Sequence, residues 1–199
     1  PGEKVFDLWK EGVKNKFLFP QLHGREHLNP EMWLEEVREN KHVRKAFDNE
    51  FFGLSMITSS IVNKPYLASL IYKDEKGKRE VEQSIEDAAI IFEANFGFTS
   101  KSFIAPLYTW DNDLEDIFMK NGIEYIQAAN SHKYYDYATN KRSRKSSAFG
   151  TTNSNGQIYL NRNCDFEPSL LKNSDGINKC LKEIANAFFW NKPAVISTH

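Results

Sequence analysis

The chain has 199 residues, 40% of them hydrophobic and 27% charged, which suits one sizeable core and excludes a disordered or fibrous protein. Its 26 basic and 27 acidic residues give a net charge of −1, so no overall field attracts nucleic acid or an anionic membrane. The apolar runs are too short and too often interrupted by charge for a transmembrane segment, and two cysteines without CxxC spacing exclude a redox dithiol or zinc knuckle.

The N-terminal part predicts helices around one strand. Apolar residues at helical spacing predict a helix over 5–13, and the apolar run 17–22 predicts a strand. A second helix is expected over 30–47, with proline in its first turn. Residues from about 48 to 79 contain Gly, Pro and a mixed-charge stretch, which predicts an irregular insertion.

The middle of the chain predicts a helix, a strand and a helix in succession. The first helix spans 81–96 and ends at Gly97, and the strand over 102–105 is closed by Pro106. Asp111 or Asn112 is expected to cap the next helix, over 114–121.

The C-terminal part continues this alternation. Strands are predicted over 123–127, 157–161 and 194–197, with a helix over 177–190 and a polar loop over 128–156. Alternating strands and helices predict a parallel sheet in a single α/β domain spanning 1–199. In such folds the loops after the strands carry the functional residues.

Two histidines follow the first predicted strand. His23 and His27 are four residues apart, and neutral imidazole is a preferred ligand of zinc. Glu26 precedes His27, so the segment is not a zinc-protease HExxH motif, and Gly24 favours a loop. A divalent metal site is therefore predicted, with zinc preferred over cobalt or nickel and at least one further ligand required. Chance placement of two histidines is the alternative.

Two carboxylates lie beside the strand end near Cys164. Asp165 and Glu167 are candidates for the paired acids of a glycoside hydrolase; alternatively, Asp165 orients a catalytic histidine or both residues have structural roles. Basic residues at 141–145 are expected to be solvated rather than bound to nucleic acid.

Aromatic residues in a strand-exit loop are candidates for contacts to a sugar. Tyr108 and Trp110 could stack on a sugar ring, with burial in the core as the alternative for tryptophan. Arg25 is a further candidate substrate-binding residue. His199 follows an apolar strand and is a candidate general acid.

Three segments together resemble the polysaccharide deacetylase family of carbohydrate esterases: 19–27, 103–108 and 195–199. The resemblance implies a distorted (β/α) barrel that uses a divalent metal to remove N- or O-linked acetyl groups from a polysaccharide or oligosaccharide. It also implies that His23 and His27 hold the metal, that His199 protonates the leaving group, and that the backbone amide of Tyr108 stabilises the oxyanion.

The sequence departs from that family at two places. Leu107 separates Pro106 from Tyr108, and the family's Asp-Asp pair does not precede His23. We therefore expect a barrel incomplete at its N-terminus, with the pair upstream of Pro1, and, from the family, an envelope or secreted protein. A carbohydrate-binding barrel without catalysis is the alternative, beside the glycosidase that uses Asp165 and Glu167.

Overall fold

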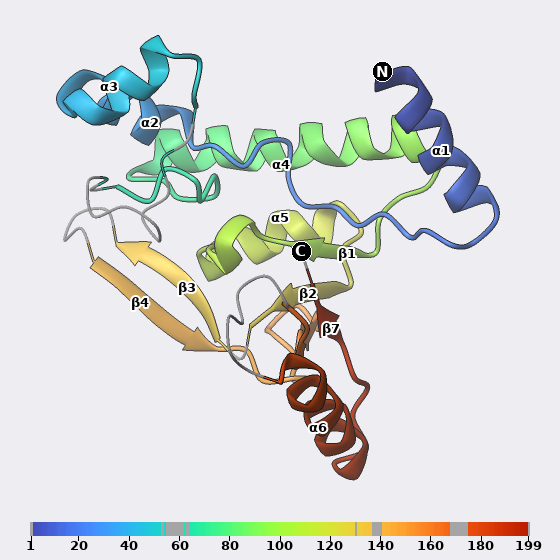
Figure 1. Ribbon diagram of the computed structural model, residues 1–199. Coiled ribbons are helices and arrows are strands. Elements are labelled where there is room, and N and C mark those ends of the chain that lie inside the picture. The colour runs from blue at the N-terminus through green and yellow to red at the C-terminus, as the bar shows by residue number, and fades with distance from the viewer. Residues whose placement is uncertain are drawn as a thin grey trace.

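The computed structural model describes residues 2–52, 54, 62, 64–129, 131–136, 141–167 and 175–198, without the side chains of 2, 3, 135, 136 and 142. A long helix, α4 (Glu75–Phe96), spans the width of the molecule, with α1 (Gly2–Lys14) at one end and two short helices at the other (Figure 1). Phe6 packs on Phe96 with ring centroids 6.2 Å apart, which joins α1 to the end of α4.

The predicted helix over 30–47 is two helices, α2 (Pro30–Glu39) and α3 (Lys41–Asp48). Asn40 has an extended backbone, with φ −111° and ψ 108°, and its side chain accepts hydrogen bonds from the amides of His42 and Val43. An asparagine that caps a new helix also ends the preceding one. The single-helix prediction was wrong because helical periodicity continues across this break.

Helix α4 begins six residues before the predicted start. The Asp74 side chain accepts from the Gly77 amide at 2.9 Å, and Gly97, with φ 76°, ends the helix in the left-handed conformation. The mixed-charge stretch is therefore the first turn of a helix rather than the tip of an insertion. Residues 53, 55–61 and 63 of the predicted insertion lie outside the described residues, whereas Tyr66 and Leu70 are buried.

Parallel strands form the centre of the fold. β1 (Ser102–Ile104), β2 (Tyr125–Ala128) and β5 (Ile158–Asn161) form a parallel sheet in the order β1-β2-β5. β6 (Cys164–Asp165) and β7 (Ile196–Ser197) form a second parallel pair. The parallel pairing agrees with the prediction, and helices join β1 to β2 and β6 to β7, whereas β2 and β5 are connected by an antiparallel hairpin instead of a helix. Among the described strands these sheets remain separate, so the closed barrel stays a prediction.

The predicted strand over 17–22 is reduced to one parallel bridge, between Leu22 and Phe103. Leu22 is buried, whereas Phe17 and Phe19 are exposed. The bridge nevertheless extends the sheet beyond β1, because the Ile104 amide donates to the Leu22 carbonyl at 2.9 Å.

A β-hairpin occupies much of the predicted polar loop over 128–156. β3 (Ser131–Asp136) and β4 (Lys141–Ser146) pair antiparallel, with His132 opposite Lys145, and project from the sheet in Figure 1. The loop prediction was wrong because the sequence of β4, KRSRKS, contains no apolar residue, so it lacks the alternating hydrophobic signal of a strand.

Two further helices complete the fold. α5 (Glu115–Lys120) follows two 3₁₀ turns, η1 (Pro106–Tyr108) and η2 (Asn112–Leu114), and α6 (Gly176–Phe189) precedes β7. The predicted cap at Asp111 or Asn112 was wrong: η2, which begins after Asp111, and α5, which begins after Leu114, have no side-chain cap.

Two apolar clusters support these elements. The larger packs α4 and α5 on the sheet and includes Ile85, Phe103, Phe118 and Ile126. The smaller lies between α2, α3 and the turns near residues 62–71. No helix in the described part of the chain has the length and apolarity needed to cross a membrane.

Candidate functional site

The loops that follow four parallel segments converge on one cavity of about 340 Å³. His23 and His27 follow the bridge at Leu22, Arg162 follows β5, and Thr198 follows β7. The fourth wall is formed by the end of β1 and the residues after it: Ile104, Ala105, Leu107 and Tyr108. We call this cavity the histidine pocket. Its position at the carboxyl ends of the strands is the position predicted for a site.

The two histidine rings lie together, with centroids 5.4 Å apart and planes inclined by 64°. Nδ1–H of His23 donates to the carbonyl oxygen of Ile104 at 2.7 Å, which places the lone pair of the neutral ring on Nε2. Burial lowers the pKa of His23 despite this hydrogen bond, and the charges of His27 and Arg162 lower it further. His23 is therefore neutral at pH 7 and can accept a proton or bind a metal through Nε2.

The pair does not by itself complete a metal site. A zinc ion is held by four protein ligands in a structural site, or by three protein ligands and a water molecule in a catalytic site. Within the described ranges, no group of three or more His, Cys, Asp or Glu side chains is arranged to hold a metal. His199, predicted as the general acid, lies outside the described residues. His23 and His27 are thus two donors of a set that the described residues do not complete.

Tyr108 lines the pocket, as predicted, on a backbone with unusual conformation. Leu107 and Tyr108 have φ values of 54° and 51°, which typically cost a non-glycine residue on the order of 1–2 kcal/mol. The Tyr108 amide donates to the Ala105 carbonyl at 2.9 Å. The hydrogen atom of this amide is thus engaged within the turn, and the oxyanion role stays a prediction.

Trp110 was predicted to bind substrate, and the structure contradicts this. Its side chain is only 1% exposed, its Nε1 donates to Glu115 at 3.1 Å, and its ring stacks on His132 at a centroid distance of 3.9 Å. A sugar cannot reach either face of a ring buried in this way. Trp110 belongs to the core, which was the alternative considered for it.

Asp165 lies outside the histidine pocket. Its side chain is 61% exposed and faces α6, where Lys179 Nζ lies 3.4 Å from Oδ2. Its backbone amide donates to Glu183 at 2.8 Å. Glu167 comes two residues later, beyond the carboxyl end of β6. The described contacts therefore attach Asp165 to α6, while Glu167 follows the strand on the side where the other pocket loops emerge.

Arg25 faces away from the histidine pocket and lines two neighbouring cavities. Its guanidinium donates to both oxygens of Glu26, at 2.5 and 2.8 Å, and to Asp87 at 2.5 Å. These bonds hold Arg25 between its own loop and α4. Its predicted contact with substrate in the pocket is not supported by this placement.

Arg162 and Thr198 are pocket residues that the sequence interpretation overlooked. Both occur immediately after predicted strands, at 157–161 and 194–197. The rule that placed the histidines at a strand end applies equally to them, so position along the chain was the signal that could have identified them.

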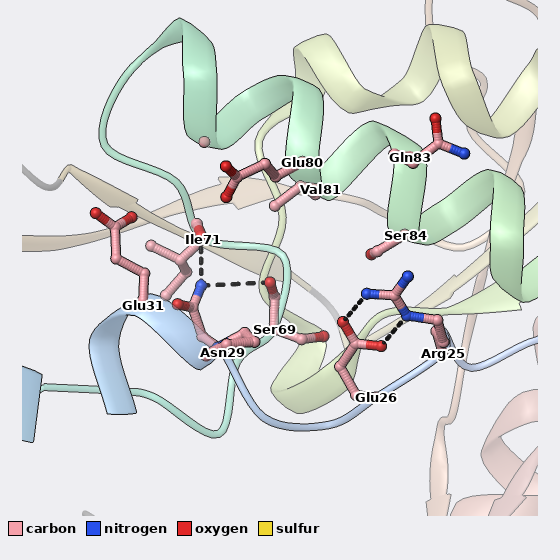
Figure 2. Close-up of a pocket in the computed structure, with 12 residues that line it drawn as sticks. Arg25, Glu26, Asn29, Glu31, Ser69, Ile71, Glu80, Val81, Gln83 and Ser84 are labelled. Atoms are coloured by element: carbon pink, nitrogen blue, oxygen red, sulfur yellow. Dashed lines mark hydrogen bonds and ion pairs between the residues drawn. The ribbon is translucent and has the colours of Figure 1, made fainter. Parts of the chain in front are cut away.

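Asn29 holds the loop that carries the histidines (Figure 2). Its Nδ2 donates to the carbonyls of Ile71 at 2.6 Å and Ser69 at 3.4 Å, and its Oδ1 accepts from the Met32 amide at 3.0 Å. The side chain is 5% exposed. One buried amide thus caps α2 and fastens the histidine loop to the segment before α4.

Asn29→Ala is expected to lower the free energy of unfolding by about 2 kcal/mol, since it removes a helix cap and leaves buried carbonyls without their donor. Urea unfolding followed by circular dichroism measures the loss. Asp74→Ala, which removes the exposed cap of α4, is the matched control with an expected loss of about 1 kcal/mol. Equal losses would show that the bonds to Ser69 and Ile71 contribute nothing.

The parallel strands and the pocket at their carboxyl ends define an α/β protein with a strand-end ligand site. Residues 54–163 match the family model for glycosyl hydrolase family 57. The match covers more than half of the chain, from the turns before α4 to the end of β5 and beyond, and includes Arg162 and the residues after β1. The chain belongs to glycosyl hydrolase family 57.

This membership confirms the predicted class, a hydrolase of carbohydrate metabolism. The matched family is a glycosyl hydrolase family, so the coarser part of the resemblance, to carbohydrate-active enzymes, is confirmed, whereas the match does not extend to the polysaccharide deacetylase family. No curated protein matches the chain.

Proposed function

We propose that the chain hydrolyses glycosidic bonds in an oligosaccharide or polysaccharide bound at the histidine pocket. Membership of a glycosyl hydrolase family is the observation that carries this proposal. The pocket supports it, because its cavity of about 340 Å³ falls within the size range of small-molecule sites and is lined by several groups that form hydrogen bonds.

Glycosidic cleavage ordinarily requires two carboxyl groups on either side of the bond. The predicted pair was Asp165 and Glu167. Neither side chain lines the histidine pocket, but Glu167 lies beyond the carboxyl end of β6, on the side where the pocket loops emerge, whereas Asp165 faces Lys179 of α6. Glu167 is therefore the candidate of the two for a carboxyl group that approaches a bound sugar. His23, neutral and with Nε2 available, is placed to accept a hydrogen bond from a sugar hydroxyl or an attacking water.

A second candidate is metal-dependent removal of acetyl groups, favoured by the adjacent rings of His23 and His27. Zinc is the metal that an imidazole pair suits best, with cobalt or nickel as alternatives. When bound, such an ion would polarise the acetyl carbonyl and acidify a water molecule. The described residues supply only these two donors for such an ion.

One assay separates the two reactions. The chain is incubated with oligomers of glucose in α and β linkage and with oligomers of N-acetylglucosamine, and new reducing ends and released acetate are both measured. Reducing ends are expected. Acetate without reducing ends would overturn glycosidic cleavage in favour of deacetylation, and binding without either product would indicate a carbohydrate-binding domain.

Matched variants test the residues. Glu167→Gln is expected to lower the rate of reducing-end formation by about 100-fold or more, the usual contribution of a general acid or base, whereas Asp165→Asn should leave it within a few-fold. A larger loss of rate for Asp165→Asn than for Glu167→Gln would assign the catalytic role to Asp165. Zinc calorimetry on the chain and on a His23→Ala, His27→Ala double variant tests the metal separately.

A further inference from the structure

The histidine pocket contains an arginine, Arg162, that forms no ion pair with a carboxylate of the described residues. Its lining residues that carry or can carry charge are His23, His27 and Arg162, together with the phenol of Tyr108. Among the described residues, no Asp or Glu lines this cavity. The pocket is therefore suited to a ligand that brings a negative charge.

Arg162 is held where a ligand can reach it. Its backbone amide donates to the Ala128 carbonyl at 3.3 Å, which fixes the backbone of Arg162 beside the end of β2. Its side chain is half-buried, and Nη1 makes one long hydrogen bond, of 3.5 Å, to the Ser197 hydroxyl. No ion pair joins it to any carboxylate in the described part of the chain.

Arg25, on the other side of the histidine loop, shows the contrast. Its guanidinium is ion-paired with Glu26 and Asp87, so its charge and its donors are already used. Toward the described residues, the Arg162 side chain makes only one long hydrogen bond, so most of its five N–H donors remain for a ligand. A guanidinium binds a carboxylate through two parallel hydrogen bonds, a planar arrangement that a neutral hydroxyl cannot reproduce.

We propose that Arg162 makes the histidine pocket selective for a sugar that bears a carboxylate, a uronic acid unit of an acidic glycan. The proposal rests on the proposed function, which places the sugar in this pocket. In it, the carboxylate pairs with the Arg162 guanidinium, while Tyr108, Thr198 and His23 remain for the sugar hydroxyls. A neutral sugar would leave the half-buried guanidinium without a counter-ion, which is unfavourable.

The test is a binding titration with three probes: glucuronate, glucose and acetate. Binding is followed by NMR through the imidazole resonances of His23 and His27, on the wild-type chain and on Arg162→Gln and Arg162→Lys. We expect glucuronate to bind at least about tenfold more tightly than glucose, as one charge-assisted pair provides. Acetate should bind much more weakly than glucuronate, because it lacks the hydroxyls.

The variants should change the ratio of the two sugar affinities. Arg162→Gln is expected to bring the ratio near one, and Arg162→Lys to retain part of it, since lysine keeps the charge without the planar fork. Arg44→Gln is the control, because Arg44 is exposed on α3 and paired with Asp48. Its variant should bind like the wild type.

Three outcomes would overturn the proposal: equal affinities for both sugars, a preference that survives in Arg162→Gln, or acetate binding as tight as glucuronate, which would mean an adventitious anion only. Glucose binding without a preference contradicts this inference and leaves the proposed function standing. A preference for glucuronate without hydrolysis of any acidic or neutral oligosaccharide contradicts the proposed reaction alone. Absence of binding by either sugar contradicts both.

Discussion

Glu115→Ala is expected to lower the free energy of unfolding by about 3 kcal/mol or more. The Glu115 side chain is 2% exposed, and its two oxygens accept hydrogen bonds from four donors that are themselves partly or wholly buried. Each donor left unpaired in the interior costs on the order of 1–3 kcal/mol. The donors are Trp110 Nε1 at 3.1 Å, Asn112 Nδ2 at 2.8 Å, Tyr159 OH at 2.7 Å and Asn153 Nδ2 at 2.9 Å.

This network joins segments that are distant in the sequence. Tyr159 belongs to β5 and Glu115 begins α5, so the carboxylate connects the sheet to the helix that packs on it. Burial and the hydrogen bond to Glu115 raise the pKa of Tyr159, which keeps its hydroxyl protonated as a donor. Losing the carboxylate therefore weakens the attachment of α5 to β5.

Urea unfolding followed by tryptophan fluorescence measures this loss. Glu115→Gln keeps the shape of the side chain but replaces one acceptor oxygen by an NH₂ group. We therefore expect its loss of unfolding free energy to be smaller than that of the alanine variant. Asp116→Ala is the control, because its carboxylate is exposed and, among the described residues, bonds to Asn155 alone, at 2.7 Å. Its loss should stay below about 0.5 kcal/mol. A loss under about 1 kcal/mol for Glu115→Ala would contradict the structural role.

Acid is expected to destabilise the protein through His132. Its side chain is fully buried, its Nε2 lies 3.2 Å from Asn112 Oδ1, and no described residue bonds to its Nδ1. Burial lowers the pKa of His132 from 6.5 to about 4. Protonation would place a charge and an unpaired N–H in the core beside Trp110.

The direction of the pH dependence follows from proton binding. Above pH 6.5 the imidazole is neutral in both states and contributes nothing. Between about pH 6.5 and 4 the unfolded chain binds a proton that the folded chain does not, so stability falls as the pH falls. Below about pH 4 both states are protonated and the full loss remains, about 3 kcal/mol at 1.36 kcal/mol per pH unit.

Urea unfolding at pH 7, 5 and 4 on the wild type and on His132→Phe isolates this contribution from that of the carboxylates. Phenylalanine keeps an aromatic ring against Trp110 and cannot titrate in this range. The wild type is expected to lose about 3 kcal/mol more than His132→Phe between pH 7 and 4. His42→Gln, at an exposed position on α3, should behave like the wild type. Parallel pH profiles for wild type and His132→Phe would show that His132 does not couple to folding.

Much of the secondary structure could be predicted because its causes are local. The spacing of apolar residues located α4, α5 and α6, and Gly97 marked the end of α4. The division at Asn40 and the hairpin β3-β4 were not predicted. In the first, one capping side chain outweighed a continuous apolar pattern. In the second, the two strands are polar and pair with each other, so they lack the apolar alternation by which a strand is predicted.

The sequence by itself determined that His23 and His27 follow an apolar segment, which pairs with β1 at Leu22. This position identified the two histidines as candidates for a site. The sequence also determined the class of the protein, through the family match over residues 54–163. Both depend only on the order of residues along the chain and not on its tertiary contacts.

Only the tertiary structure decided which of the candidate side chains reach the pocket. Trp110 is buried against His132, Asp165 is attached to α6, and the Tyr108 amide is engaged, whereas Arg162 enters the pocket from β5. The physical reason is that burial and hydrogen-bond partners depend on segments distant in sequence, while hydrophobic patterns and caps extend over only a few residues.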